Sequence, residues 1–415
     1  MTGTQHPDVL VVGLGAMGSA ITCQLARRGV KVVGVDQFSP PHSHGSTHGE
    51  TRITREAIGE GQQFVPLAMR SHQLWREMER ETGRTLFNAC GGLVIAREDA
   101  PSRMHDQRDF LGNTFRAAEA FGIQYERLSA SEISSRFPHF LLRGDECGYF
   151  EPGAGYVDPE ACVSAQLSLA SDRGATLNLG ETVQRIAHVN GQTIIDTDRA
   201  RYAAGVTIVA AGPWMPQLLP AFAASLTVRR QVLYWFRCNA NNAVKSVPAQ
   251  PLSYRPRDFP IFIWHWGEGA DDVFYGFPEI NAAGAIKVAT EQCVETTTPA
   301  LVKREVAETE ITAMHARHIA GRLNGIGSRC VKALTCLYTN APGANFVIDL
   351  LPDAPDTIVV SACSGHGFKH SAAIGEAVAE MAITRETPAV LQPFAIADRK
   401  ITANSNVCNI SNVTR

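Results

Sequence analysis

The stretch of this sequence that decides its fold is Asp8-Val9-Leu10-Val11-Val12-Gly13-Leu14-Gly15-Ala16-Met17-Gly18. The apolar run at residues 8–12 is typical of a buried strand, and it leads directly into a glycine-rich turn. A helical pattern that includes Ile21 and Leu25 follows, and a second apolar run at residues 30–35 ends in Asp36. The order of strand, helix and strand predicts a βαβ unit.

The three glycines and the aspartate of this unit match a dinucleotide-binding fingerprint. Gly13 permits the tight turn, Gly15 lets the backbone approach a pyrophosphate, and Gly18 lets the helix pack closely against the strand. The helix N-terminus offers unpaired N–H groups to the phosphates, and we expect Asp36 to accept hydrogen bonds from a ribose. The fingerprint alone does not choose between FAD and NAD.

Length and composition exclude several classes of protein. A chain of 415 residues is too long for one core, which favours two or three domains. Hydrophobic residues make up 45% and charged residues 19%, with a net charge of −3, so we expect neither disorder nor a nucleic-acid partner. None of the ten cysteines is spaced as C-x-x-C, and no apolar run approaches a membrane span. We therefore expect no metal site, no membrane segment, and a cytoplasmic protein.

Patterns further along the chain predict additional elements. Residues 64–81 have apolar side chains at helical spacing, followed by a Thr82-Gly83 stop, and Asp158 precedes Pro159 as an N-cap for a second helix. A strand at residues 182–186 is expected to complete a second crossover. Between residues 226 and 327, alternating strands rich in aromatic residues indicate an antiparallel sheet.

Two blocks of sequence carry a resemblance to a known family. The first is Gly45-Ser46-Thr47-His48-Gly49-Glu50-Thr51-Arg52-Ile53-Thr54-Arg55, followed by Gly59-Glu60-Gly61. The second consists of Cys336-Leu337-Tyr338-Thr339, Phe346-Val347-Ile348-Asp349 and Ser364-Gly365-His366-Gly367-Phe368-Lys369. The chain, from residue 8 to about residue 394, resembles the monomeric sarcosine oxidase and N-methyltryptophan oxidase family of FAD-dependent amine oxidases.

This resemblance implies a fold and a cofactor. The expected fold is α/β (α+β), with a Rossmann-like FAD-binding domain of glutathione-reductase type and an interleaved substrate domain that contains a mixed or antiparallel sheet. We assign residues 8–90, 155–225 and 330–395 to the FAD-binding domain, residues 91–154 and 226–329 to the substrate domain, and residues 396–415 to a C-terminal tail.

The resemblance also assigns residues to the cofactor. Cys336 matches the cysteine that carries the flavin through a thioether in this family, and its nearest alternatives are Cys330 and Cys363. Burial as an ordinary free cysteine is the competing interpretation. Gly365 and Gly367 match cofactor-binding glycines.

Arg55 and Lys369 correspond to the pair that grips the carboxylate of the substrate. A planar guanidinium can bind a carboxylate through two hydrogen bonds while an ammonium adds a point charge. The alternative for both residues is solvated surface charge.

Four further residues match positions around the flavin. Arg52 is expected to stabilise the reduced flavin, and Lys287 to promote reaction with oxygen, because a fixed cation lowers the energy of superoxide. His48 matches a residue of the same neighbourhood, although a loop-stabilising role is an alternative. Tyr275 resembles a tyrosine of the substrate pocket, and a core tyrosine is its alternative.

The sequence departs from the family pattern in three places. One residue is inserted between Tyr275 and Lys287 relative to sarcosine oxidase. Where the family has an active-site histidine, a few residues after the lysine, this chain has Thr290-Glu291-Gln292. The segment Phe262-Ile263-Trp264-His265-Trp266 replaces a less aromatic stretch. If alternate members of this segment face the pocket, the substrate is bulkier or more aromatic than sarcosine, although tryptophans packed in a sheet need no ligand.

The resemblance predicts oxidation of a small secondary amine, such as sarcosine, another N-methyl amino acid or a cyclic imino acid. Hydride transfer to the flavin gives an imine, and oxygen then takes the electrons to give hydrogen peroxide. One alternative is a dehydrogenase that passes electrons to another carrier, and another is a flavin-binding redox subunit without turnover. We expect a monomer whose partners are the amine and O2.

Overall fold

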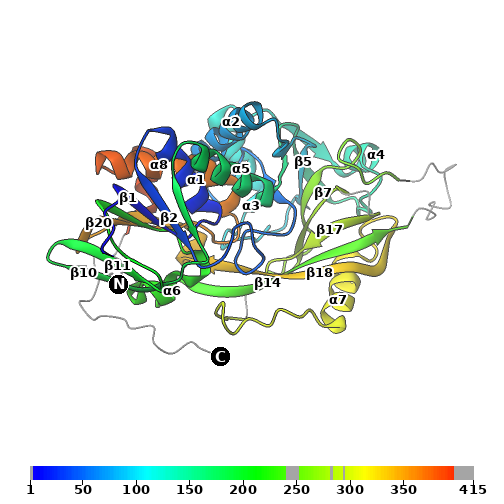
Figure 1. Ribbon diagram of the computed structural model, residues 1–415. Coiled ribbons are helices and arrows are strands. Elements are labelled where there is room, and N and C mark those ends of the chain that lie inside the picture. The colour runs from blue at the N-terminus through cyan, green and yellow to red at the C-terminus, as the bar shows by residue number, and fades with distance from the viewer. Residues whose placement is uncertain (1–2, 240–251, 281–283, 293–294, 397–415) are drawn as a thin grey trace.

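The computed structural model describes residues 3–239, 252–280, 284–292 and 295–396, and two large sheets organise this part of the chain (Figure 1). The expected C-terminal tail, from residue 397 onward, lies outside the described residues. The glycine-rich turn directly follows a strand of the smaller of the two sheets. The larger one extends away from it through two long neighbouring strands, β14 (Thr227–Cys238) and β18 (Ile326–Asn340) (Figure 1).

The first sheet has six strands in the order β19-β20-β13-β1-β2-β9. Their bounds are β1 Val9–Val12, β2 Val32–Asp36, β9 Thr176–Leu179, β13 Val206–Val209, β19 Val347–Leu351 and β20 Ala354–Ser361. All neighbours pair in parallel except β19, which runs antiparallel to β20. Every residue of β1, β2 and β13 is buried, as a parallel sheet covered on both faces requires.

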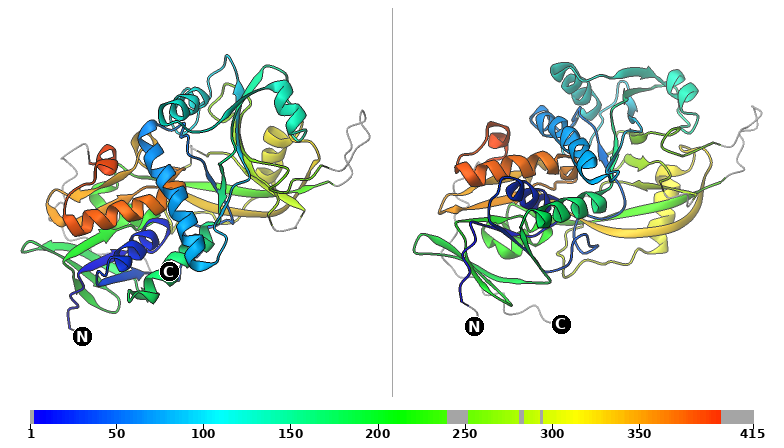
Figure 2. Two further views of the ribbon diagram at one scale, coloured as in Figure 1. Left: turned by 90° about the horizontal axis from the view of Figure 1, so that it is seen from above. Right: turned by 45° about the horizontal axis from the view of Figure 1, so that its top comes forward.

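Helices cover one face of this sheet. Helix α1 (Ala16–Arg27) lies between α5 (Pro159–Asp172) and α8 (Ser371–Thr384), so segments from three distant parts of the chain pack together (Figures 1 and 2). Val9 and Val11 of β1 point into the core on this helical side. The predicted N-cap of α5 is confirmed, because the side chain of Asp158 accepts a hydrogen bond of 2.8 Å from the backbone N–H of Ala161.

The helix predicted at residues 64–81 is also confirmed. Helix α2 (Val65–Thr82) packs against α8 and ends at Gly83, whose φ of 68° is the left-handed conformation that glycine adopts most easily.

A small antiparallel sheet covers the opposite face. It contains β10 (Val183–Val189), β11 (Gln192–Thr197) and β12 (Arg201–Ala203), and Leu10 and Val12 of β1 share a core cluster with it. The strand expected to complete the second crossover at residues 182–186 therefore belongs to this sheet. The crossover strand is β9, which pairs in parallel with β2. β10 is half-exposed, with polar residues that a fully buried parallel strand excludes.

The second sheet has eight strands in the order β18-β14-β17-β16-β15-β5-β7-β6. Their bounds are β5 Gly92–Arg97, β6 Glu126–Ser129, β7 Glu146–Glu151, β14 Thr227–Cys238, β15 Ile261–His265, β16 Val273–Phe277, β17 Ala285–Ala289 and β18 Ile326–Asn340. Only β5 and β15 pair in parallel, so the sheet is mixed and largely antiparallel, as the sequence predicted.

Strand β18 crosses residue 330, where the sequence placed a domain boundary. Its pairing with β14 extends from Ile326 to Asn340. The boundary expected at residue 330 therefore falls inside a strand of the eight-stranded sheet, and the division into domains stays a prediction.

Three short strands, β3 (Arg52–Thr54), β4 (Phe87–Asn88) and β8 (Gly155–Val157), form a further antiparallel sheet in the order β3-β8-β4. The other α-helices of the described chain are α3 Phe110–Phe121, α4 Ala130–Arg136, α6 Met215–Leu218 and α7 Glu308–Met314. Within the described ranges, no helix is long and apolar enough to cross a membrane, and no cluster of histidine, cysteine and acidic residues could hold a metal ion.

The aromatic segment at residues 262–266, most of which forms β15, packs mainly into an apolar core instead of the candidate site. Phe262 and Trp264 are buried in an apolar cluster with Phe140 and Phe274. Alternation along the strand turns only Ile263 of this segment into the cavity described below. The idea that these aromatic side chains select a bulky substrate is therefore wrong.

Candidate active site

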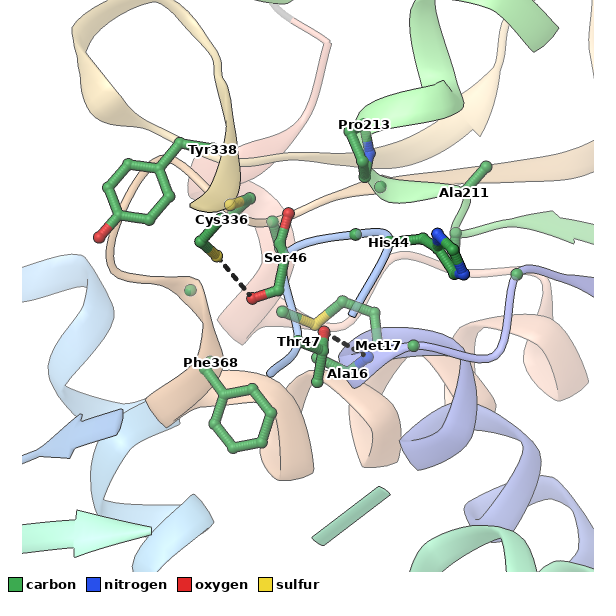
Figure 3. Close-up of a pocket in the computed structure, with 18 of the residues that line it drawn as sticks. Ala16, Met17, His44, Ser46, Thr47, Ala211, Pro213, Cys336, Tyr338 and Phe368 are labelled. Carbon is green, nitrogen blue, oxygen red and sulfur yellow. Dashed lines mark hydrogen bonds between the residues drawn. The ribbon is translucent and has the colours of Figure 1, made fainter. Parts of the chain in front are cut away.

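One cavity of about 700 Å³ contains most of the residues that the sequence singled out. Side chains from β18, from the loop at residues 44–47 and from the start of α1 point into it (Figure 3). Of the predicted site residues, those that line the cavity are Gly13, Gly15, Asp36, Arg52, Arg55, Tyr275, Lys287, Cys336, Gly365, Gly367 and Lys369. The cavity therefore joins the glycine-rich turn to the cationic residues.

The geometry of the glycine-rich turn explains its sequence. Gly13 has a φ of 88°, and a Cβ on Gly18 would lie 1.7 Å from the carbonyl oxygen of Gly13. A Cβ on Gly15 would meet no atom closer than Thr47 Oγ1, at 3.6 Å, so this residue keeps open the approach to the backbone. Helix α1 starts at Ala16, whose N–H donates to Thr47 Oγ1 over 3.4 Å (Figure 3). The turn thus presents a helix N-terminus to the cavity.

Asp36 ends β2 beside this turn. Its carboxylate accepts hydrogen bonds of 2.8 Å from the backbone N–H groups of Leu14 and Phe38. Burial raises the pKa of Asp36, and these two hydrogen bonds oppose that effect. Each carboxylate oxygen keeps an acceptor position, which suits the hydroxyl groups of a ribose.

Cys336 is buried on β18, with its sulfur at the cavity wall. Its thiol donates to the carbonyl oxygen of Ser46 over 3.4 Å (Figure 3). Arg52 Nη2 lies 3.6 Å from the sulfur. Burial raises the pKa of the thiol, whereas Arg52 lowers it. Of the two alternatives, Cys363 lines the cavity, while Cys330 does not and donates instead to the carbonyl oxygen of Lys332.

Lys287 is held on β17 with only 3% of its surface exposed. Its ammonium donates to the carbonyl oxygens of Gly49 and Thr51 over 2.8 and 2.7 Å. An ammonium has three N–H donors, so one donor remains after these two bonds. Burial lowers the pKa of Lys287 well below its usual range, and neighbouring Arg52 lowers it further. Lys287 therefore does not face solvent.

Tyr275 lines the same cavity from β16. Its hydroxyl lies 3.2 Å from the hydroxyl of Tyr338, which comes from β18. The two tyrosines form a hydroxyl pair at the cavity wall, so Tyr275 is not a residue of the apolar core alone.

Arg55 and Lys369 converge on Glu60. Arg55 Nη2 lies 2.7 Å and Lys369 Nζ 3.3 Å from its carboxylate, and all three side chains are at least nine-tenths buried. Although burial opposes the shift, Lys369 and Arg55 hold the pKa of Glu60 well below its usual range. Burial lowers the pKa of Lys369 to about 8, an effect that Glu60 partly offsets. Neither cation is a solvated surface charge.

His48 and the two later glycines occupy different positions. His48 is buried but is absent from the cavity lining, and burial together with Arg52 lowers its pKa to about 3. His48 still lies close enough to Arg52 and Lys287 for their charges to act on it, so its role near the flavin stays a prediction. Gly367 has no room for a side chain, because a Cβ there would lie 1.7 Å from the carbonyl oxygen of Ala362. Gly365 has a φ of 79° and faces His105.

The cavity also contains side chains to which the sequence gave no role. Glu60, His105, Glu291 and Tyr338 are among them. Glu60 and Tyr338 stood inside the quoted blocks, and Glu291 stood at a departure from the family pattern. His105 lies in a loop without any motif, so no signal in the sequence could have found it.

Comparison with known proteins identifies the family. Residues 8–381 match the family described as FAD dependent oxidoreductase. The chain belongs to this family. A monomeric sarcosine oxidase of Streptomyces avermitilis is 37% identical over 384 residues, which cover 92% of this chain and 94% of that protein. An N-methyl-L-tryptophan oxidase of Salmonella dublin is 30% identical over 94% of this chain and 98% of that protein.

A solved structure agrees with the fold. NikD, described as an unusual amino acid oxidase essential for nikkomycin biosynthesis, superposes with a TM-score of 0.78 at 24% identity, over 94% of this chain and 98% of that one. The predicted α/β fold of the FAD dependent oxidoreductases is confirmed. The chain is an enzyme of this family, an FAD-dependent amine oxidoreductase that acts on CH–NH bonds, as the sequence predicted.

The cavity fits the FAD that this family binds. A dinucleotide needs phosphate donors and a ribose acceptor, which the start of α1 and Asp36 supply. Within the described chain, the buried hydroxyl groups of Ser46 and Thr51 line the cavity and have no hydrogen-bond partner. Unpartnered buried hydroxyl groups are costly, and a polar ligand in the cavity would satisfy them.

Proposed function

We propose that this protein oxidises a secondary amine that carries a carboxylate, and that it uses O2 as the electron acceptor and releases hydrogen peroxide. The substrates we propose are N-methyl amino acids, including sarcosine, and cyclic imino acids. The observation that carries the proposal is the convergence of Arg55, Lys369 and Lys287 on one cavity together with Cys336 and the glycine-rich turn. The names of the relatives, a sarcosine oxidase and an N-methyl-L-tryptophan oxidase, support the same substrate class.

Arg55 and Lys369 bind the substrate carboxylate in this proposal. Both cations are buried in the cavity wall, where the attraction to an anion is stronger than in water. Glu60 already neutralises part of their charge and fixes their positions. The carboxylate of the substrate would complete the remaining hydrogen bonds of the guanidinium and the ammonium.

Cys336 holds the FAD covalently in this proposal. Its sulfur lies at the cavity wall and in contact with Arg52, whose charge favours the thiolate. Bound FAD supplies the capacity to accept a hydride from the substrate and to pass electrons on. Arg52 would then stabilise negative charge that develops beside it.

Lys287 promotes the reaction with oxygen. It borders the main cavity and also a second cavity of about 310 Å³, and the two cavities share Thr51 and Phe277. A small molecule such as O2 could reach the lysine from this second side. The remaining N–H donor of Lys287 would stabilise the negative charge of reduced oxygen. We further propose a monomer, in keeping with the name of the sarcosine oxidase relative.

Anaerobic titration of the flavin spectrum tests the substrate class. The purified protein is mixed with a panel of N-methyl amino acids, cyclic imino acids, primary amino acids and secondary amines that lack a carboxylate. We expect the yellow absorbance to bleach with secondary amines that carry a carboxylate. Equal bleaching by amines without a carboxylate would refute the proposed role of Arg55 and Lys369 in binding the substrate carboxylate. Bleaching by no amine would refute the proposed function.

A further inference from the structure

Glu291 has a largely buried carboxylate with unused hydrogen-bonding capacity. It follows β17, lines the same cavity as Arg55 and Lys369, and its side chain is 10% exposed. Among the described residues its carboxylate contacts only His105, through the backbone N–H at 3.4 Å and through Nε2 at 3.8 Å. Both distances are long for hydrogen bonds, and a carboxylate offers about four acceptor positions.

Glu60, in the same cavity, is a useful comparison. It is held by Arg55 at 2.7 Å and by Lys369 at 3.3 Å, with His105 Nδ1 at 3.4 Å. The negative charge of Glu60 is therefore compensated by the protein, whereas, among the described residues, that of Glu291 has only His105 beside it. A buried carboxylate without close donors is costly unless a ligand supplies them.

His105 fixes the position of Glu291. Its backbone is left-handed, with a φ of 48°, and its ring is buried between Glu60 and Glu291. Gly365 makes room for this ring, because a Cβ there would lie 2.6 Å from His105 Nε2. Burial lowers the pKa of His105, but Glu291 and Glu60 outweigh it and raise the pKa overall. The two carboxylates and the imidazole thus form one continuous chain of contacts that ends at Lys369.

We propose that Glu291 receives the positively charged nitrogen of an amino-acid ligand whose carboxylate is bound by Arg55 and Lys369. The cavity then presents cations to one end of a zwitterion and a carboxylate to the other. This inference rests on the proposed function, because it assigns the second half of the same substrate site. It selects ligands that carry a cationic nitrogen over uncharged carboxylates of the same shape.

A pair of ligands with equal shape tests this preference in the holoenzyme. Trimethylammonioacetate carries a permanent positive charge on nitrogen, and tert-butylacetate has carbon in its place. Neither has an amine lone pair to oxidise, so dissociation constants can be measured from the perturbed flavin spectrum without turnover. We expect the wild type to bind trimethylammonioacetate more tightly by roughly tenfold to a hundredfold, the scale of a hydrogen-bonded or ion-paired charge.

Three variants locate the origin of the preference. Glu291→Gln should abolish it and leave binding of tert-butylacetate within about a factor of three, because the amide keeps the shape and removes the charge. His105→Asn should reduce the preference partly, since asparagine tolerates the left-handed backbone but no longer positions Glu291. Glu268→Gln removes a carboxylate that pairs with Arg97 on the surface, and it should change neither constant.

The outcomes separate this inference from the function itself. If the wild type binds both ligands equally, or binds neither, the proposed role of Glu291 is wrong. The role is also wrong if Glu291→Gln keeps the preference while its flavin content and melting temperature match those of the wild type. The function instead fails when no amine bleaches the flavin, whatever the preference between these two ligands.

Discussion

Cys336 differs from the neighbouring cysteines in the atoms that surround its sulfur. It faces the cavity and touches Arg52 and Ser46, whereas Cys330 lies on the same strand and bonds to the backbone of Lys332. Cys363 lines the cavity but makes no such contact with an arginine within the described chain. Of these three cysteines, Cys336 is therefore the one at the cavity wall beside a cation that favours the thiolate.

Acid precipitation tests the covalent link. Precipitated wild-type protein should retain yellow flavin in the pellet, and Cys336→Ser should release it to the supernatant, because a hydroxyl cannot form the thioether. Cys330→Ser and Cys363→Ser are matched controls that should retain the flavin. Release from the wild type would show that FAD is bound without a covalent bond, and release from Cys363→Ser alone would move the link to that residue.

Lys369→Met tests the carboxylate grip. Loss of one charge-assisted contact should weaken binding of substrates with a carboxylate by roughly tenfold to a hundredfold. Glu60 remains paired with Arg55 in this variant, so FAD content and melting temperature should change little. Anaerobic titration gives the dissociation constants. A secondary amine without a carboxylate serves as the control, and an equal loss of affinity for that amine would contradict the assigned role.

The charge of Lys287 should make reoxidation depend on pH. Only the ammonium form can stabilise negatively charged reduced oxygen, so the rate should fall as pH rises through the lysine pKa. Because burial lowers this pKa, the fall should come below the range of an exposed lysine. Stopped-flow mixing of reduced protein with oxygen measures it. Lys287→Met should be slower by on the order of a hundredfold and independent of pH, with a smaller effect on anaerobic reduction. If the wild type and Lys287→Met are reoxidised at the same rate at every pH, Lys287 does not act as a cation in this reaction.

At the scale of elements, local signals predicted the helices better than the strands. Helix α2 and helix α5 have clear stops and caps at Gly83 and Asp158, which act within one turn of the chain. The strand predicted at residues 182–186 was assigned to the wrong sheet, because its pairing partners are set by tertiary contacts that no local pattern encodes. The polar residues of this strand were the local signal against a buried parallel strand.

The contact between α1 and the glycine-rich turn gives a prediction at this scale. Gly18→Ala would place a Cβ 1.7 Å from the Gly13 carbonyl oxygen, so the helix must shift away from the phosphate-binding turn. Overpacking of this kind costs about 1 to 3 kcal/mol, and FAD content should fall as well. Gly153→Ala is the control, because a Cβ there meets no atom within 4 Å. Thermal unfolding and absorbance at the flavin band measure both effects, and full FAD content in Gly18→Ala would contradict the account.

At the scale of the whole molecule, the site depends on contacts between distant segments. Arg55 and Lys369 were found because each stands in a recognisable block, but their shared partner Glu60 lies 309 residues from Lys369 and only the fold brings them together. His105 stands in a loop without a motif and enters the cavity by a left-handed turn. The sequence therefore predicted FAD and named cations that line the cavity, whose roles stay predictions, and it gave no role to the groups that balance their charge.

The yield of hydrogen peroxide is the most direct test of the central claim that this enzyme couples amine oxidation to oxygen. Purified holoenzyme is mixed in air with the amine that bleaches its flavin fastest. The amount of hydrogen peroxide and the amount of product derived from the imine are then measured in the same sample. The account predicts one peroxide for each amine oxidised, at a rate that an added artificial electron acceptor does not raise. Amine oxidation that proceeds only with the artificial acceptor, without peroxide, would contradict the oxidase function and favour a dehydrogenase.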